Sequence, residues 1–383
     1  METTGTILDP PSGDANELPR VPSAAEVKST IPRSCFQSNL PTSLKYAGFS
    51  LGLTFICAVV GATCIPIHHY AIPLWIGYAL ITGTVATGCW VIAHECGHGA
   101  FCRRKWLENA IGYIIHSLML VPYFSWQRSH SIHHARTNHL ELGETHVPVK
   151  GTETANSNSK TTRSTWQQRR RGAWEIFTHL AIGWPLYLMF GLTGGPIRGM
   201  TNHFWPYWPF SSALFPGKWK AKVLASTVGV LTTLIALIAW AWYAGSIIPV
   251  LLLYGGPYLV VNAWLVLYTW LHHTDVDVPH LDATQWTWIR GAFLTVDRPY
   301  GRLLNTLHHG IGSTHVVHHL CPAIPHYHAQ EATDAIKNAF PDLYRFDATP
   351  IHRALWRIAI HCDFVWPHYD DWRFKHHADE QSI

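Results

Sequence analysis

Long apolar stretches alternate with polar segments along this chain. Four of the apolar stretches contain no acidic or basic residue and reach the length of about 20 residues that a helix needs to cross a bilayer. They cover residues 46–66, 71–93, 223–243 and 246–270. Only a few residues separate the first from the second and the third from the fourth, so the pattern predicts two helical hairpins in a membrane.

Two further apolar stretches differ from these four. Residues 178–197 are interrupted by Pro185, Gly191, Gly194, Gly195 and Pro196, which favours a helix at the membrane surface or half inserted in it. Residues 110–124 are shorter and contain His116, so we expect them at the interface or inside the protein.

The two ends of the chain carry another pattern. Residues 1–42 are rich in Pro, Ser, Thr and Glu without a sustained apolar period, which predicts a mobile tail with a short ordered end near residues 31–36. Residues 43–375 then form one membrane domain, and residues 376–383 a C-terminal tail.

Basic residues indicate the orientation in the membrane. The segment between the second and third apolar stretches is rich in Lys and Arg, which is typical of a cytoplasmic segment. Each terminus is separated from this segment by an even number of membrane crossings, so both termini are expected on the cytoplasmic side as well. We therefore expect an all-α integral membrane protein with four transmembrane helices, interfacial helices and a cytosolic helical cap.

Composition supports a membrane protein and excludes several other classes. Only 14% of the residues are charged, whereas 19 are Trp, so a disordered or acidic protein is excluded. A net charge of +4 without a basic, aromatic-rich face gives no support for nucleic-acid binding. The eight cysteines form no C-x-x-C pair and are expected to be reduced thiols.

Histidine is the unusual residue, because 27 histidines outnumber 24 aspartates and glutamates. Eight of them form three clusters, all in the segments expected to be cytosolic. The clusters are His94 with His98, then His130, His133 and His134, then His315, His318 and His319. Residues three or four apart share a helix face, whereas the adjacent histidine points about 100° away, so one such cluster can serve two metal ions.

The number and type of these side chains point to iron. Eight imidazoles exceed the four ligands of a zinc site, and imidazole without thiolate or many carboxylates is a good iron ligand. Two alternatives stay open from the residues alone. HECGH is also the H-E-x-x-H pattern of a zinc protease, with Glu95 as general base. A histidine-rich metal transporter or haem-binding scaffold would instead carry histidines within its spans.

The same segments resemble a known family. HECGHGAF, HSIHH and THVVHHL followed by IPHYHAQEAT closely resemble the membrane-bound fatty acyl desaturases, above all their Δ12 (omega-6, oleate-type) branch. WTWIRGAFLTVDRPYG and LHHGIGSTHVVHH resemble that branch as well. The likeness runs from about residue 31 to residue 364, nearly the whole ordered chain.

The resemblance implies a multi-pass endoplasmic reticulum protein with both termini and a di-iron centre on the cytosolic side. O2 and two electrons would then remove two hydrogens from adjacent methylenes of an acyl chain. Carried over by position, the eight clustered histidines are metal ligands, and His273 after the last span is the expected ninth. His309, Asn138 and Asp297 are candidates for orienting the ligands.

One departure leaves the product open. The third cluster has Val317 where Δ12 desaturases usually carry Ala, and a larger residue there is typical of relatives with other products. The alternatives are therefore an acetylenase, a hydroxylase, an epoxygenase or an omega-3 desaturase.

The substrate is expected to be a fatty acyl lipid or acyl-CoA. The chain contains neither the H-P-G-G of a cytochrome b5 domain nor a nucleotide-binding G-x-G-x-x-G. The resemblance implies that electrons come from a separate cytochrome b5 and its NADH-dependent reductase.

Overall fold

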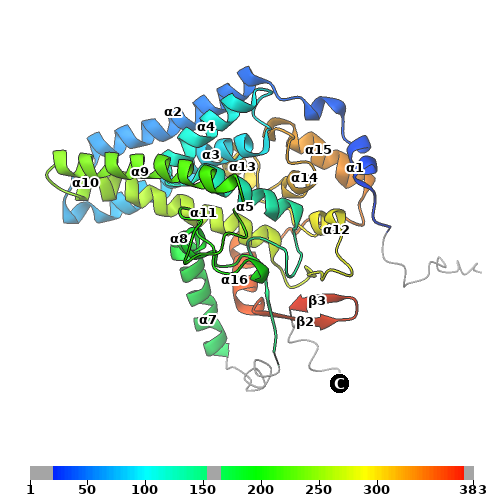
Figure 1. Cartoon of the computed structure of the whole chain (residues 1–383). Coiled ribbons are helices and arrows are strands. Elements are labelled where there is room, and N and C mark those ends of the chain that lie inside the picture. Colours follow the sequence, from blue (N-terminus) through cyan, green and yellow to red (C-terminus); the bar gives the residue numbers. More distant parts are fainter. Residues whose placement is uncertain (1–19, 153–164, 375–383) are drawn as a thin grey trace, which may run out of the picture.

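The computed structural model describes residues 20–152 and 165–374 (Figure 1). The predicted C-terminal tail at residues 376–383 and the first 19 residues of the predicted N-terminal tail lie outside the described residues.

Four helical segments are long and apolar enough to cross a membrane, as the hydrophobic pattern predicts. They are Leu40–Cys64, His69–His98, Trp219–Tyr243 and Ile248–His273. In element terms they are α2 (Leu40–Cys64), η2 (His69–Ala71) with α3 (Ile72–His98), α9 (Trp219–Tyr243), and the run of α10 (Ile248–Val250), η5 (Leu251–Gly255) and α11 (Gly256–His273). The second and fourth segments continue beyond the apolar stretches, so His98 and His273 belong to the spanning helices themselves.

Local sequence explains where these helices begin and end. Asn39 caps α2, because its side chain accepts a hydrogen bond from the backbone N–H of Thr42. Gly99 ends α3 in the left-handed conformation, with φ of 77°, which glycine adopts without a steric penalty.

Helix α3 is the central element of the bundle. Its most apolar window is 67% buried, against 17% for α2, and it packs against α2, α4 and α11. Close contacts at small residues allow this packing: a Cβ at Gly83 would lie 2.5 Å from Cβ of Val260. In Figure 1 the long helices run alongside one another, and the short helices α1, α12, α14 and α15 gather at one end.

The remaining elements are shorter than the four spanning segments. The helices are α1 (Ala24–Thr30), η1 (Arg33–Phe36), α4 (Lys105–Leu118), α5 (Tyr123–Ala135), α7 (Thr165–Thr178), η3 (His179–Gly183), α8 (Trp184–Phe190), η4 (Pro196–Arg198), α12 (Trp288–Phe293), α13 (Gly301–Leu307), α14 (His315–Leu320), α15 (His326–Ala339) and α16 (Ile351–His361). The apolar stretch 178–197 is broken into several of these pieces and is not among the four spanning segments.

A small sheet is an addition to the predicted all-helical fold. Its strands are β1 (Val149–Lys150), β2 (Phe364–His368) and β3 (Asp371–Phe374). Their order is β1-β2-β3. Strand β1 is parallel to β2, and β2 is antiparallel to β3. The sheet joins the segment after α5 to the C-terminal part of the chain.

Among the described residues, the ordered part of the predicted tail begins at helix α1, earlier than the short ordered end expected near residues 31–36. Helix α1 begins with a capping box of Ser23 and Glu26, and Val27, Ile31 and Cys35 are buried against α14 and α15. These three side chains come from α1, from the extended residue that follows it and from η1, and they pack in one apolar cluster. The Pro- and Ser-rich composition of the region conceals these three apolar positions.

Candidate metal centre

Four helices bring nine histidines together at the polar end of the bundle. Helix α3 carries His94 and His98, α5 carries His130, His133 and His134, α11 carries His273, and α14 carries His315, His318 and His319. Residues far apart in the chain thus share one buried region, as the sequence predicts.

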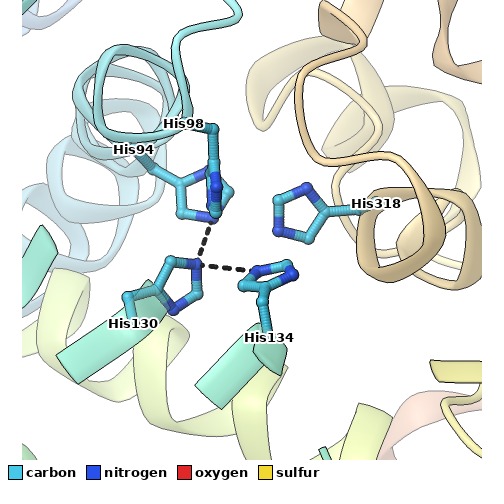
Figure 2. A group of neighbouring side chains, drawn as sticks. All are labelled: His94, His98, His130, His134 and His318. Carbon is cyan, nitrogen blue, oxygen red and sulfur yellow. Dashed lines mark hydrogen bonds between the residues drawn. The ribbon is translucent and has the colours of Figure 1, made fainter. Parts of the chain in front are cut away.

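Five of these histidines form the first group, shown in Figure 2. They are His94, His98, His130, His134 and His318, and one ring nitrogen of each lies within 4.8 Å of those of the others. Nε2 of His130 lies 2.9 Å from Nε2 of His94 and 3.2 Å from Nε2 of His134. The rings come from three helices and converge on one point.

The other four histidines form the second group. His133, His273 and His319 have ring nitrogens within 4.8 Å of one another. Nε2 of His273 lies 3.0 Å from Nε2 of His133 and 3.0 Å from Nε2 of His315.

Adjacent histidines therefore separate: His133 joins the second group and His134 the first, and His319 and His318 divide in the same way. This is the outcome expected for neighbours on a helix.

The donor set fits metal ions. Buried ring nitrogens of His98, His318 and His319 have no hydrogen-bond partner among the described residues, although buried polar atoms normally have one. Burial lowers the pKa of His133 to about 4 and holds the pKa of His319 well below its ordinary value. The imidazoles are therefore neutral at neutral pH, which is the form that binds a metal.

Polar contacts behind the rings orient two of them. Nδ1 of His133 donates to the carbonyl oxygen of Glu144 at 2.6 Å and lies 2.8 Å from Oγ1 of Thr145. Nδ1 of His319 lies 3.0 Å from Oγ1 of Thr137, which itself donates to the carbonyl oxygen of His133. These contacts use Nδ1 on both rings, so Nε2 is the nitrogen left for a metal ion, as in known metal sites. Sequence analysis missed all three partners because Thr and Glu have no distinctive spacing here.

Glu144 is itself held in place. Its carboxylate accepts hydrogen bonds from Arg198 and Tyr187, each at 2.9 Å. Burial raises the pKa of this carboxyl to about 7, although Arg198 opposes the shift.

The three candidates for orienting the ligands have different surroundings. Nε2 of His309 lies 2.8 Å from Oγ of Ser50, and the ring packs on His326. Asn138 adopts a left-handed conformation with φ of 58° and lines a small cavity beside His133 and His273.

Asp297 reaches no ring. Its Oδ1 accepts the backbone N–H of Val316 at 2.9 Å, so it acts on helix α14 itself.

His272, next to His273, is not in either group. Its Nδ1 donates to the carbonyl oxygen of Val296, and its Nε2 lies 3.1 Å from the hydroxyl of Tyr300. Both nitrogens are used, so this ring is a structural contact.

The partner of Glu95 is a histidine outside both groups, His326. The carboxylate of Glu95 accepts the backbone N–H of His326 at 2.5 Å and lies 2.8 Å from Nδ1 of the same residue. A zinc-protease base would have to face the metal and its water, so this arrangement gives no support to the protease alternative.

Two cavities adjoin the first group. Val317 is buried and lines a small one beside His94, His98 and His318. The other reaches His130 and is walled by apolar side chains. These include Trp90, Trp126, Trp184, Leu265 and Val266.

The fold and this site define a class: a membrane protein with four apolar helices and a histidine-rich site able to hold two metal ions. Comparison with known proteins identifies the family. The family model described as fatty acid desaturase matches residues 73–351. The chain belongs to the fatty acid desaturase family, and it is therefore an oxidoreductase that acts on fatty acids with O2.

Three relatives illustrate the range of the matches. The omega-6 fatty acid desaturase, endoplasmic reticulum, of Brassica juncea is 39% identical over 94% of this chain and 93% of its own. The Delta(12)-acyl-lipid-desaturase of Punica granatum is 39% identical over 91% and 89%. The oleoyl-12-hydroxylase of Ricinus communis is 38% identical over 89% and 86%.

Proposed function

We propose that this protein is a di-iron acyl desaturase that introduces a Δ12 double bond into an oleoyl lipid. The observation that carries the proposal is the convergence of nine histidines in two groups beside an apolar cavity. The names of the desaturase relatives support the Δ12 position and a lipid-linked substrate.

Two iron ions would be held by the two groups. The ligands are His94, His98, His130, His134 and His318 for one ion, and His133, His273, His315 and His319 for the other. When bound, iron supplies the redox chemistry by which a saturated pair of methylenes, O2, two electrons and two protons become an alkene and two water molecules.

The chain's own residues position the substrate. The cavity lined by Trp90, Trp126 and Trp184 suits an acyl chain, because most of its surface is apolar and His130 is part of its lining. Burial of the methylenes there excludes bulk water and holds the reacting carbons beside the histidines.

Electrons would come from cytochrome b5 and its NADH-dependent reductase, because the chain contains no haem or nucleotide motif of its own. We place the protein in the endoplasmic reticulum membrane, with both termini and the histidines cytosolic. The basic residues between the two hairpins support this orientation.

Expression in a yeast that lacks diunsaturated lipids tests the proposal. With cytochrome b5, its reductase and iron supplied, we expect a Δ12 diene from oleate, detected by gas chromatography with mass spectrometry. His315→Ala should abolish this product, because it removes a proposed ligand. Absence of any new unsaturated or oxygenated lipid would refute the proposal.

The second candidate function is that of a hydroxylase or of another enzyme of the family with a different product. It is favoured by Val317, whose side chain lines the cavity beside His318, and by the similarity to the oleoyl-12-hydroxylase. The same mass spectrum separates the two, because a hydroxylated chain retains one oxygen atom.

A further inference from the structure

Residues 296–300 cross between the helix ends that carry His273 and His315, and we call them the strap. All except Pro299 are buried, and Asp297 and Arg298 have no exposed surface. Two charged side chains in so buried a segment require specific partners.

On one side, the strap holds the last turn of α11. The backbone N–H of Val296 donates to the carbonyl oxygen of His272 at 3.0 Å. Nε of Arg298 donates to the carbonyl oxygen of Leu271 at 2.8 Å. The last carbonyl groups of a helix have no partner within the helix, so the strap satisfies two of them. Tyr300 adds a third contact through its hydroxyl and the ring of His272.

On its other side, the strap holds the first turn of α14. Oδ1 of Asp297 accepts the backbone N–H of Val316, and Oδ2 accepts the hydroxyl of Tyr344 at 2.8 Å. The backbone N–H of Arg298 donates to the carbonyl oxygen of Gly312 at 3.2 Å. Neighbouring residues of the strap thus hold two different helices.

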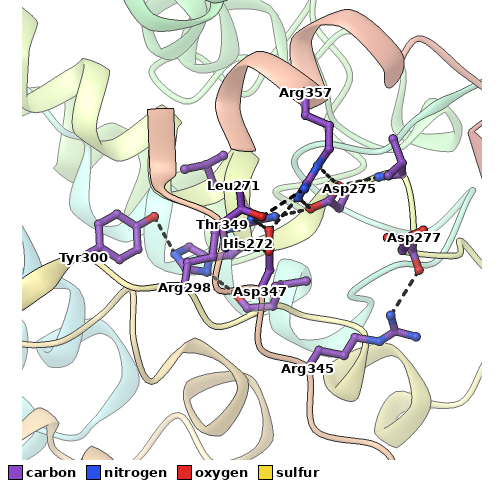
Figure 3. A network of polar contacts seen from close by, with 12 residues as sticks. Leu271, His272, Asp275, Asp277, Arg298, Tyr300, Arg345, Asp347, Thr349 and Arg357 are labelled. Atoms are coloured by element: carbon purple, nitrogen blue, oxygen red, sulfur yellow. Dashed lines mark hydrogen bonds and ion pairs between the residues drawn. The ribbon is translucent and has the colours of Figure 1, made fainter. Parts of the chain in front are cut away.

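A four-membered ionic network anchors the strap (Figure 3). The guanidinium of Arg298 contacts Asp347 and lies 2.6 Å from Oδ2 of Asp275. Nη2 of Arg357 lies 2.6 Å from both carboxylates. Two positive and two negative groups balance, so the buried guanidinium is compensated only in this position.

We propose that the strap is a positioning element for the second histidine group. Through Arg298 and Asp297 it sets the relative position of α11 and α14, and so keeps Nε2 of His273 and of His315 3.0 Å apart. Neither side chain touches a ring nitrogen of the group. The inference rests on the proposed two-metal site.

Iron affinity of the purified full-length protein tests the inference. The variants are Asp297→Leu, Arg298→Lys and Tyr300→Phe, the last of which removes only one hydroxyl. In competition with a chelator, we expect Asp297→Leu and Arg298→Lys to lower the affinity for the more weakly bound iron ion about 10–100-fold. Tyr300→Phe should move in the same direction and keeps the test valid if the other two do not fold.

Two control variants separate positioning from general stability. Asp297→Asn keeps the Oδ1 acceptor for Val316, and Arg373→Lys alters an ion pair with Asp371 in the sheet, outside the network. Both should bind both iron ions as the unmodified protein does. Thermal unfolding of the metal-free variants is measured alongside.

Each alternative outcome has a clear meaning. Wild-type iron affinity in all three strap variants, or equal losses in Arg373→Lys and Arg298→Lys, would overturn the positioning role. If the unmodified protein binds two iron ions but forms no desaturated product, only the proposed function is overturned. The role of the strap is tested by iron affinity and does not depend on the product. Unmodified protein that binds no iron would overturn both.

Discussion

Histidines that are adjacent in the chain have different roles in this protein. His133 and His134 belong to different groups, and so do His318 and His319. His272 belongs to neither, because its two nitrogens are already used by Val296 and Tyr300. A ring's role therefore depends on the groups that surround it in space.

The role of the Val317 side chain can be tested by comparison with its neighbour Val316. Val316 and Val317 are both buried in the cluster that joins α12, α14 and α15, but only Val317 lines the cavity beside His318. Each Val→Ala change should lower the free energy of unfolding by about 2 kcal/mol. We expect only Val317→Ala to change the ratio of lipid products, measured by mass spectrometry. Equal product ratios in the two variants would assign Val317 to core packing.

Helices α3 and α11 form the central contact between the two hairpins, and they carry His94, His98 and His273. A Cβ at Gly83 would lie 2.6 Å from the carbonyl oxygen of Pro257. Lipid tails give no hydrophobic force between such helices, so close packing at small residues stabilises their contact.

Gly83→Val tests this contact. We expect it to lower the free energy of unfolding by about 1–3 kcal/mol, because the added side chain forces the two backbones apart. Thermal unfolding in mild detergent measures the change. Gly48→Val is the matched control, since Gly48 is exposed and has nothing within 4 Å of its Cβ position. Equal stability of the two variants would contradict the packing argument.

At the scale of the whole molecule, the polar elements gather at one end of the helix bundle. Helices α1, α14 and α15 lie there (Figure 1), and α14 carries members of both histidine groups. The turn that joins α2 to α3 lies at the other end of the bundle, away from both histidine groups. Exposed Cys64 ends α2 at this turn.

Labelling of Cys64 tests the proposed orientation. In sealed microsomes with the cytosolic face outside, a membrane-impermeant maleimide should label this thiol only after permeabilisation. The labelled band should disappear in Cys64→Ser. Labelling of intact microsomes that is lost in Cys64→Ser would place this turn in the cytosol and reverse the topology.

The sequence alone determined the four spanning helices and the histidines near their ends. Bilayer thickness demands long apolar runs, and helix geometry demands ligands three or four residues apart, so both leave local patterns. The helix before residue 31 was not predicted, because its one buried apolar side chain, Val27, is too weak a pattern against the composition around it.

Only the tertiary structure decided which histidines share a group, that His272 is excluded, and that Glu95 points at His326. It also brought Thr137, Thr145 and the strap into their roles. These outcomes depend on contacts between segments up to 231 residues apart, as for Glu95 and His326. The partners of a buried polar group are set by the chain that packs around it, and no local spacing specifies that packing.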